Sequence, residues 1–337
     1  SHRWETKREA WEVAVRAQET VPEAAVSVAF SLDGVMVAMK AKAAERVVKQ
    51  AEAGKHASGP AGRQEAACGT VSLYDAEGER LQTIRYGRMP ESKKATLQAQ
   101  LQGEIEALSA LRPDLRRVHL ADGAETNWDR LAEIEAALGL PPEGRVKIVD
   151  FYHGCDHLKN GCDAIWGEST PRSQAEFLRL KTFLKEEDGG ADRIIRTFKH
   201  HASRTSGNRQ QRIQAELTYF RNQRPRMNYP EYLRQNLPIA SGVVEAACKT
   251  LVTQRLKRSG MAWTVAGGQA ILTFRSLIQS QRWSSAWTLL AADFRQTITI
   301  VKPATATPFQ NSLAARVVVH PVTSTRQIVY HALPLAA

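Results

Sequence analysis

Long hydrophobic segments are missing from this chain of 337 residues: it contains no run of about 18 apolar residues, the length that a transmembrane helix needs. The start of the chain also lacks the apolar core of a signal peptide. Cysteine is scarce, and this scarcity fits free thiols in a reducing cytoplasm better than a disulfide framework. The cysteines are Cys68, Cys155, Cys162 and Cys248. The sequence therefore predicts a cytoplasmic protein without a membrane segment, and 43% hydrophobic residues suffice for a sizeable core.

Acidic residues are outnumbered, most clearly in one region. The chain has 46 lysines and arginines against 35 acids, a formal net charge of +11. Between Arg193 and Arg282, 16 basic residues stand against three acids, Glu216, Glu231 and Glu245. Each phosphate that a basic residue neutralises releases condensed counterions, so this region favours a polyanionic partner, foremost nucleic acid. A solvated basic surface without a partner is the alternative.

Three acidic motifs lie far apart on the chain. Asp33 lies in Ser-Leu-Asp-Gly-Val, Asp122 in Leu-Ala-Asp-Gly-Ala, and Glu245 in Ser-Gly-Val-Val-Glu-Ala-Ala-Cys-Lys, with about 90 and 120 residues between them. Each acid ends or opens an apolar segment, where a folded core can bring the three together. Three carboxylates can hold two Mg²⁺ ions about 3.5 to 4 Å apart for phosphoryl transfer. A single Asp-Gly is more often a turn, so the hypothesis depends on the joint placement of the acids.

The first half of the chain has the pattern of a mixed α/β domain. The expected elements are strands within 22–40, over 69–74 and over 81–86, a helix over 93–111, a strand over 117–120, a helix over 126–138 and a strand over 146–150. The first three strands are expected to be antiparallel neighbours. The charged segment 41–67 has no strong period and is expected to be an insertion or a flexible connection.

The second half is predominantly helical. Residues 166–237 are polar with a helical period, broken at Gly189-Gly190 and near Gly207, which predicts an all-helical insertion. Ser241 is expected to cap a helix that begins around Val243 and carries the third acid in its first turn. The last residues, 297–337, contain no acid and predict a weak strand or a frayed tail.

Together these motifs resemble a known family. The segments that carry the resemblance are 31–37, 121–124 with Trp128, 150–153, 237–249 and 254–261 with Trp263. They are similar to bacterial insertion-sequence DDE transposases of the Kra type, which are related to Mutator-like transposases. The motif from Leu237 to Trp263 is long and specific, whereas the Asp33 motif alone is weak. The resemblance covers most of the chain and fades near Phe294.

This resemblance implies an α/β, RNase H-like (retroviral-integrase-like) fold, a mixed sheet with flanking helices and an all-helical insertion domain. It implies Mg²⁺-dependent hydrolysis at the element ends, with Mn²⁺ as a substitute, followed by attack of the freed 3′-hydroxyl on target DNA. Asp33, Asp122 and Glu245 match the family's acids and are the expected catalytic and metal-binding residues. The implied partner is double-stranded DNA, as terminal inverted repeats and target, bound by a homodimer or larger synaptic complex in the bacterial nucleoid.

The resemblance also implies a division of the chain. Residues 1–21 are expected to be the remnant of an upstream region, because the family recognises inverted repeats with a region before the first acid. The catalytic domain is expected over 22–165 and 238–294, on either side of the helical insertion 166–237. Residues 295–337 lie outside the resemblance and are expected to be a disordered or non-native tail.

Basic residues near the third acid and in the insertion are the expected phosphate contacts, which position DNA without reading its sequence. They are Arg204, Arg224, Arg226, Lys249, Arg255, Lys257 and Arg258. Exposure to solvent without a contact is the alternative for each.

Residues just after the strand at 146–150 form a further candidate group. Related transposases carry a Cys or Asp followed by His here, and Asp150 with His153 fits that pattern. His153 or His157 either positions phosphate or orders the metal shell, or serves as a structural histidine. A zinc site formed with Cys155 and Cys162 is not favoured, because no paired Cys-x-x-Cys is present.

Two other functions compete with transposition. An RNase H-like nuclease or resolvase would only hydrolyse DNA, and a decayed or domesticated protein would bind DNA without cutting it. The intact set of acids argues for activity, and the unusual tail argues for some decay.

Overall fold

The computed structural model describes residues 2–40, 62–301, 313–321 and 326–334. They belong to two compact units, Glu19–Ser280 and a smaller one that joins Ser1–Gln18 to Gln281–Ala337. The expected connection over 41–67 lies outside the described residues as far as residue 61; its last residues, from Arg63, already belong to a strand. No helix in the described part of the chain is long and apolar enough to cross a membrane.

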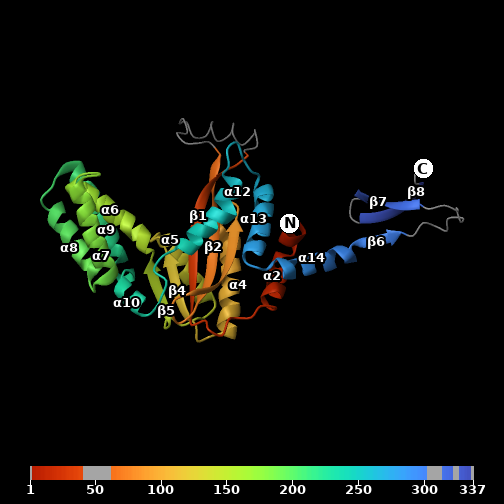
Figure 1. Cartoon of the computed structure of the whole chain (residues 1–337), viewed down its shortest axis with the longest axis horizontal. Helices are drawn as coiled ribbons and strands as arrows, with labels where there is room; N and C mark the ends of the chain where they lie inside the picture. Colours follow the sequence, from red (N-terminus) through yellow and green to blue (C-terminus); the bar gives the residue numbers. More distant parts are fainter. Residues whose placement is uncertain (1, 41–61, 302–312, 322–325, 335–337) are drawn as a thin grey trace. The chain divides into compact units, whose positions relative to one another are not determined.

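A five-stranded mixed sheet is the centre of the larger unit (Figure 1). The strands are β1 (Ser27–Ala38), β2 (Arg63–Tyr74), β3 (Arg80–Arg88), β4 (Arg116–Ala121) and β5 (Arg145–Val149). Their order is β3-β2-β1-β4-β5. The first three strands are antiparallel neighbours, as the sequence predicts, while β4 is parallel to β1 and β5 to β4. This mixed sheet with helices on both faces is an RNase H-like fold.

Two helices cover one face of the sheet. They are α4 (Ala95–Leu111), which follows a single 3-10 turn η1 (Ser92–Lys94), and α5 (Glu125–Ala137). Their apolar side chains form one buried cluster with Val28, Phe30 and Leu32 of β1. Successive side chains of a strand point to opposite faces, so the odd-numbered residues of this part of β1 face the other way.

The opposite face of the sheet is covered by the helix that follows β5 and by the helices that follow the insertion. They are α6 (Phe151–Trp166), α11 (Gly242–Ala247), the π-helix η3 (Cys248–Thr253), α12 (Gln254–Leu256) and α13 (Val265–Gln279). Val37 of β1 and Cys68 of β2 are buried there against Val244 and Leu251. The odd-numbered side of β1, which includes Asp33, therefore faces these helices.

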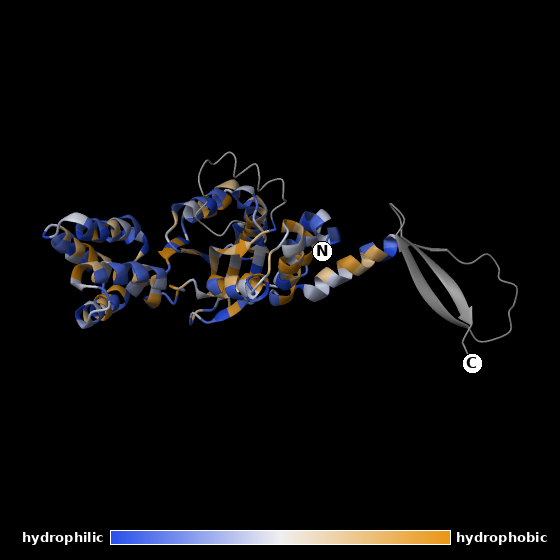
Figure 2. Cartoon of the chain, turned by 90° about the horizontal axis from the view of Figure 1, so that it is seen from above, coloured by the Kyte–Doolittle hydropathy of each residue, from blue (hydrophilic) through white to orange (hydrophobic). Residues whose placement is uncertain are grey.

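The segment between α6 and α11 is helical, and its breaks fall where the glycines predict them. Its elements are α7 (Pro171–Glu186), α8 (Gly190–Ala202), α9 (Gly207–Gln223), η2 (Arg224–Arg226) and α10 (Tyr229–Arg234). A side chain at Gly190 would place its Cβ 2.3 Å from the backbone oxygen of Phe183, so the α7–α8 turn requires glycine. Figure 2 shows hydrophobic residues concentrated in the sheet and largely hydrophilic colours on this group of helices.

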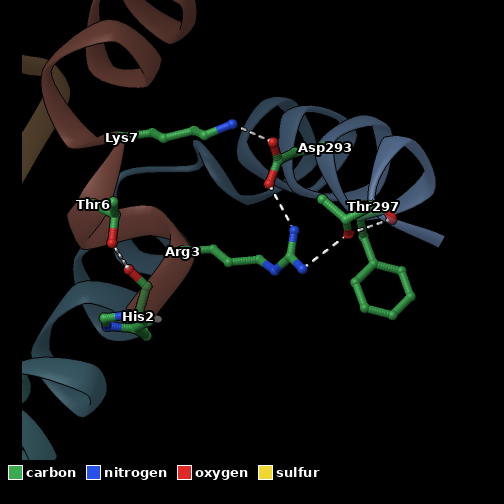
Figure 3. A network of polar contacts seen from close by, with 7 residues as sticks. His2, Arg3, Thr6, Lys7, Asp293 and Thr297 are labelled. Atoms are coloured by element: carbon green, nitrogen blue, oxygen red, sulfur yellow. Dashed lines mark hydrogen bonds and ion pairs between the residues drawn. The ribbon is translucent and has the colours of Figure 1, made fainter. Parts of the chain in front are cut away.

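The described residues of the smaller unit include the helices α1 (His2–Thr6), α2 (Arg8–Arg16) and α14 (Trp283–Gln296). The side chains of Arg3 and Lys7 both donate to the carboxylate of Asp293, with Arg3 Nη1 at 2.9 Å (Figure 3). Arg3 Nη2 also donates to Thr297 Oγ1 at 2.9 Å. Hydrogen bonds from Lys7 and Arg3 lower the pKa of Asp293. These polar contacts join the first helix turns of the chain to α14.

Three strands follow α14, in the region where the sequence predicts a weak strand or a frayed tail. They are β6 (Ile298–Val301), β7 (Leu313–Pro321) and β8 (Arg326–Pro334), in the order β6-β8-β7. The β7–β8 pair is antiparallel and the β6–β8 pair is parallel.

Candidate active site

Asp33 lies in β1, and Asp122 directly follows the last residue of the adjacent parallel strand β4. The register pairs Ser31 of β1 with Leu120 of β4, and Asp33 and Asp122 each follow that pair by two residues. Leu120 is buried in the cluster that contains α6. Side chains two residues apart on a strand share a face. The sheet therefore brings these two acids to the same level of neighbouring strands.

Both carboxylates are engaged by their own backbone. Asp33 Oδ1 accepts a hydrogen bond from the N–H of Gly34 at 2.6 Å. Asp122 Oδ1 accepts from the N–H of Ala124 at 3.0 Å and from Asn127 Nδ2 at 3.2 Å. The second pattern is an Asx turn that leads into α5, the ordinary role of an Asp-Gly pair. Asp33 instead lies within the paired part of β1.

Glu245 lies in the first turn of α11, as predicted, and its side chain is exposed. Ser241 occupies the N-cap position, but α11 begins at Gly242 and the serine hydroxyl makes no capping hydrogen bond. It donates to Glu245 Oε1 at 3.2 Å instead. The expected cap therefore acts as a partner of the third acid.

Asp150 joins α11 to the strands that carry the other acids. Its backbone N–H donates to the carbonyl of Ala121 at 2.8 Å, one residue before Asp122. Its carboxylate, 1% exposed, accepts from the N–H of His153 at 2.6 Å and from the N–H of Ser241. Phe151 N–H adds a bond to the carbonyl of Ile239 at 2.9 Å. Asp150 is thus a structural junction beside the predicted site.

A pair of buried thiols connects the helix of Glu245 to Asp33. Cys248 lies three residues after Glu245, which places the two on one side of the helix. A hydrogen bond with Cys68, burial and the negative charge of Asp33 raise the pKa of Cys248 well above its usual value. Cys68 is the register partner of Asp33 on β2. Cys248 is also the first residue of the π-helix η3. This type of helix is rare in proteins, and where it occurs it is frequently found at functional sites.

Two residues of α9 that the sequence analysis did not single out as site residues, Glu216 and Tyr219, contact His157 of α6. His157 Nδ1 lies 2.7 Å from Glu216 Oε2, and the ring of Tyr219 stacks on His157 at 3.5 Å between centroids. Burial, followed by the negative charges of Asp122 and Asp150, raises the pKa of Tyr219. Tyr219 lies 97 positions after Asp122 and 26 before Glu245, and the only local signal was the histidine pair with its single-turn spacing, His153 and His157.

The three predicted acids have the chemistry of a divalent-ion site. Carboxylate oxygens suit the hard ions Mg²⁺ and Mn²⁺, and Asp33, Asp122 and Glu245 are the residues that would hold such an ion. Among the residues that the structure describes, however, no group of three or more His, Cys, Asp or Glu side chains could hold a metal ion, so Asp33, Asp122 and Glu245 are not gathered into one such group. Cys155 and Cys162, the sulfur atoms of the unfavoured zinc alternative, are buried, and burial raises both pKa values to about 12.

The predicted DNA contacts fall into two groups. Lys249, Lys257 and Arg258 are exposed along and just after the helix of the third acid. Arg255 there lies over the Trp263 ring at 5.8 Å.

In the insertion, the predicted basic residues have partners within the protein. Arg224 Nε pairs with Asp192 Oδ1 at 2.7 Å. Arg226 Nη1 donates to Gln223 Oε1 at 2.7 Å, and its guanidinium lies 4.9 Å from the centre of the Trp128 ring. Arg204 contacts the ring of His200. DNA would have to compete with these partners.

Comparison with known proteins identifies no family. No protein-family profile matches the sequence, and no curated protein matches it. Among solved structures, the chain is similar to the Drosophila P element transposase strand transfer complex, with 9% sequence identity and a TM-score of 0.25. The match covers 84% of this chain and 70% of that chain.

Proposed function

We propose that residues 22–294 form the catalytic part of a DNA transposase, in which Asp33, Asp122 and Glu245 support metal-dependent strand cleavage and strand transfer. The observation that carries the proposal is the register of β1 and β4, which brings two of the acids to the same level of adjacent strands. The helix of the third acid packs on the same face of the sheet. The long motif around Glu245 and the basic residues after it support DNA as the substrate.

Each part of the chain has a distinct task in this proposal. Asp33 lies in the paired part of the central strand β1, and Asp150 ties the third acid's helix to the end of β4. A bound Mg²⁺ would supply positive charge that offsets the charge developing on the phosphate in the transition state. Lys249, Lys257 and Arg258 would hold the DNA backbone beside the acids. Because their contacts are to phosphate, they would bind without sequence preference.

The test compares three charge-removing variants in the full chain. Asp33→Asn, Asp122→Asn and Glu245→Gln should each abolish Mn²⁺-dependent nicking of supercoiled plasmid and joining of a 3′-hydroxyl duplex to that plasmid. Asp129→Asn and Glu106→Gln make the same chemical changes at exposed positions of α5 and α4, which cover the opposite face, and should keep full activity. Full strand transfer by any of the first three variants would overturn the assignment of that acid.

The same assay separates the competing functions. A nuclease or resolvase would nick the plasmid and never join the supplied 3′-hydroxyl. A protein that only binds DNA would do neither, would take up no Mn²⁺ in calorimetry, and would still show DNA affinity that falls steeply with salt.

A further inference from the structure

The helical insertion carries its charges at opposite ends. Around the turn between α7 and α8 lie four acids, Glu186, Glu187, Asp188 and Asp192. From Arg193 to Arg212, which covers most of α8, the α8–α9 turn and the start of α9, the chain has six lysines and arginines and no acid. The turn between α6 and α7 lies at this second end, because the ring of Trp166 contacts the ring of His201, with 5.2 Å between centroids.

Basic side chains from three helices and a turn meet at this second end of the insertion. We call the group the basic corner; its residues are Arg172, His200, His201, Arg204, Arg209 and Arg212. Burial, followed by the positive charges of His200 and of three arginines of the corner, lowers the pKa of His201. Arg209 and Arg212 line a hollow of about 450 Å³ beside Trp166. The corner is therefore one continuous surface.

Acids near the basic corner do not neutralise it. Asp163 and Glu168 border the same hollow. Asp163 pairs with Lys159, with Oδ1 and Nζ 2.5 Å apart, and Glu168 is exposed without an ion pair to any described residue.

Two arginines of the basic corner have no partner within the fold. Arg172 and Arg212 are exposed, and neither forms an ion pair or a hydrogen bond with another residue in the described part of the chain. Arg172 is the second residue of α7, where the positive end of the helix dipole disfavours a cation. Arg209, by contrast, donates to the carbonyls of Ala164 and Ile165 and so has a structural role. Like charges gathered in this way repel each other, and a polyanion would remove that repulsion.

The basic corner lies within reach of a duplex that contacts the predicted acids. At the other end of α9, Gln223 Nε2 donates to the carbonyl of Gly123 at 3.0 Å, directly after Asp122. Arg212 is 11 residues before Gln223, which is about 16 Å along the helix axis. B-DNA covers that length in about five base pairs. One duplex can therefore contact both places, and the two contacts are separate.

We propose that the basic corner binds the phosphate backbone of double-stranded DNA, as a contact separate from Lys249, Lys257 and Arg258. Its exposed guanidinium groups present paired N–H donors, the geometry that phosphate oxygens accept. The corner holds a duplex without reading its sequence, and so anchors the insertion on the DNA. The inference rests on the proposed function for the identity of its partner, since that function makes DNA the substrate.

The test is the double variant Arg172→Ala, Arg212→Ala in the full chain. Its affinity for a labelled duplex is measured by fluorescence anisotropy at several salt concentrations. We expect the slope of log affinity against log salt to fall by about 2, one for each phosphate contact. The thermal midpoint should not change, because neither arginine has a partner to lose. A slope equal to that of the parent would overturn the proposal.

Two further variants separate a local contact from other causes. Lys185→Ala with Arg234→Ala removes the same charge at the acidic end of the insertion and should keep the parent's slope. If this control lowers the slope as much as the test variant, the loss comes from net charge alone and the basic corner is overturned. Arg172→Gln with Arg212→Gln keeps long polar side chains and should lose the same slope. A parental slope in this glutamine variant would assign the alanine effect to packing and overturn the role of the charges.

Plasmid nicking by Asp33→Asn is measured alongside, so that the two proposals can fail independently. If the double alanine variant binds DNA like the parent while Asp33→Asn abolishes nicking, the basic corner is overturned and the proposed function stands. If the double alanine variant loses the slope while Asp33→Asn nicks like the parent, the DNA contact stands and the role of that acid fails.

Discussion

The backbone N–H of Ser241 donates a hydrogen bond to the buried carboxylate of Asp150. This one contact joins two segments that are 91 residues apart. Asp150 follows β5, whose neighbour β4 leads to Asp122, and Ser241 precedes the helix of Glu245. The position of the third acid therefore depends on a carboxylate that is itself not one of the three.

Asp150→Asn should destabilise the protein and displace α11. An asparagine can still accept one of the two N–H bonds, from His153 or Ser241, but its amide NH₂ would face the other donor. We expect a loss of about 2 kcal/mol in the free energy of unfolding, the cost of a buried unsatisfied donor, measured by urea denaturation. Asp156→Asn, exposed on the same helix, should be neutral. Equal stability of the two variants would remove Asp150 from its role as a junction.

Stability should fall as the pH is lowered, because of a buried histidine on β4. Burial lowers the pKa of His119, against the opposing effect of Glu135, whose Oε1 lies 3.0 Å from Nε2. Below the ordinary pKa of about 6.5 the unfolded chain binds a proton that the folded protein refuses, so the folded state loses stability. The slope is at most about 1.4 kcal/mol per pH unit for one proton.

The carboxylate of Glu135 adds to this loss at lower pH. Burial opposes its ionisation, but His119 and Arg145 together lower its pKa. A folded carboxyl with a depressed pKa contributes stability above its unfolded pKa and loses it as the pH falls further. Urea denaturation between pH 8 and about 3, which extends below the ordinary glutamate pKa of about 4.3, should show both steps, and His119→Gln should remove the upper one. The exposed His200→Gln should leave the curve unchanged; an unaltered upper step in His119→Gln would assign it to another group.

A methyl group at Gly123 should disturb the Asp122 turn more than a methyl group at Gly139. Both glycines have positive φ, +99 and +64, but only the first has a neighbour near its Cβ position, Tyr219 at 3.3 Å. Gly139→Ala should cost about 1 to 2 kcal/mol from backbone strain alone. Gly123→Ala should cost more, because the strain is joined by the contact with Tyr219. Thermal unfolding of the two variants measures the difference; equal costs would mean that α9 gives way freely.

Removal of the exposed basic residues beside the third acid should change the salt dependence of DNA binding. Lys257→Ala and Arg258→Ala together should lower the slope of log affinity against log salt by about 2, one for each phosphate contact. Arg234→Ala is the control, since Arg234 pairs with Asp188 and Glu231. Fluorescence anisotropy with a labelled duplex at several salt concentrations measures the slopes. Equal slopes for parent and double variant would place the DNA elsewhere.

Elements with a strong local signal were predicted well. The order of strands and helices through β5 is confirmed, because alternation in β1 and the helical period of α4 are properties of neighbouring residues. The helix breaks that the glycines of the insertion predict are also confirmed. They are a local signal too, because glycine readily adopts the backbone conformations that a turn between helices requires. The start of β2 was missed: Arg63 to Ala67 are polar or small and have no apolar alternation, yet they pair with β1 along its far end.

The assignment of the three acids as a site stays a prediction. The motifs singled out Asp33, Asp122 and Glu245 from their own neighbours, but they contained no information on what those carboxylates contact. The role of Ser241 was misjudged, because a serine before a helix ordinarily accepts from the helix N–H groups, and only the fold shows that Glu245 receives its hydroxyl. Tyr219 and Glu216 carried no motif, since their partners lie on α6 and beyond β4.

The sequence by itself determined the elements, the positive charge around the third acid, and the three acidic motifs, because each depends on residues close together in the chain. Only the tertiary structure decided that Asp33 and Asp122 share one level of the sheet, that Asp150 holds the helix of Glu245, and that Tyr219 reaches the Asp122 turn. These relationships depend on strand register and on helix packing across roughly 90 to 100 residues. Register and packing arise from the whole core at once, so no local pattern could specify them.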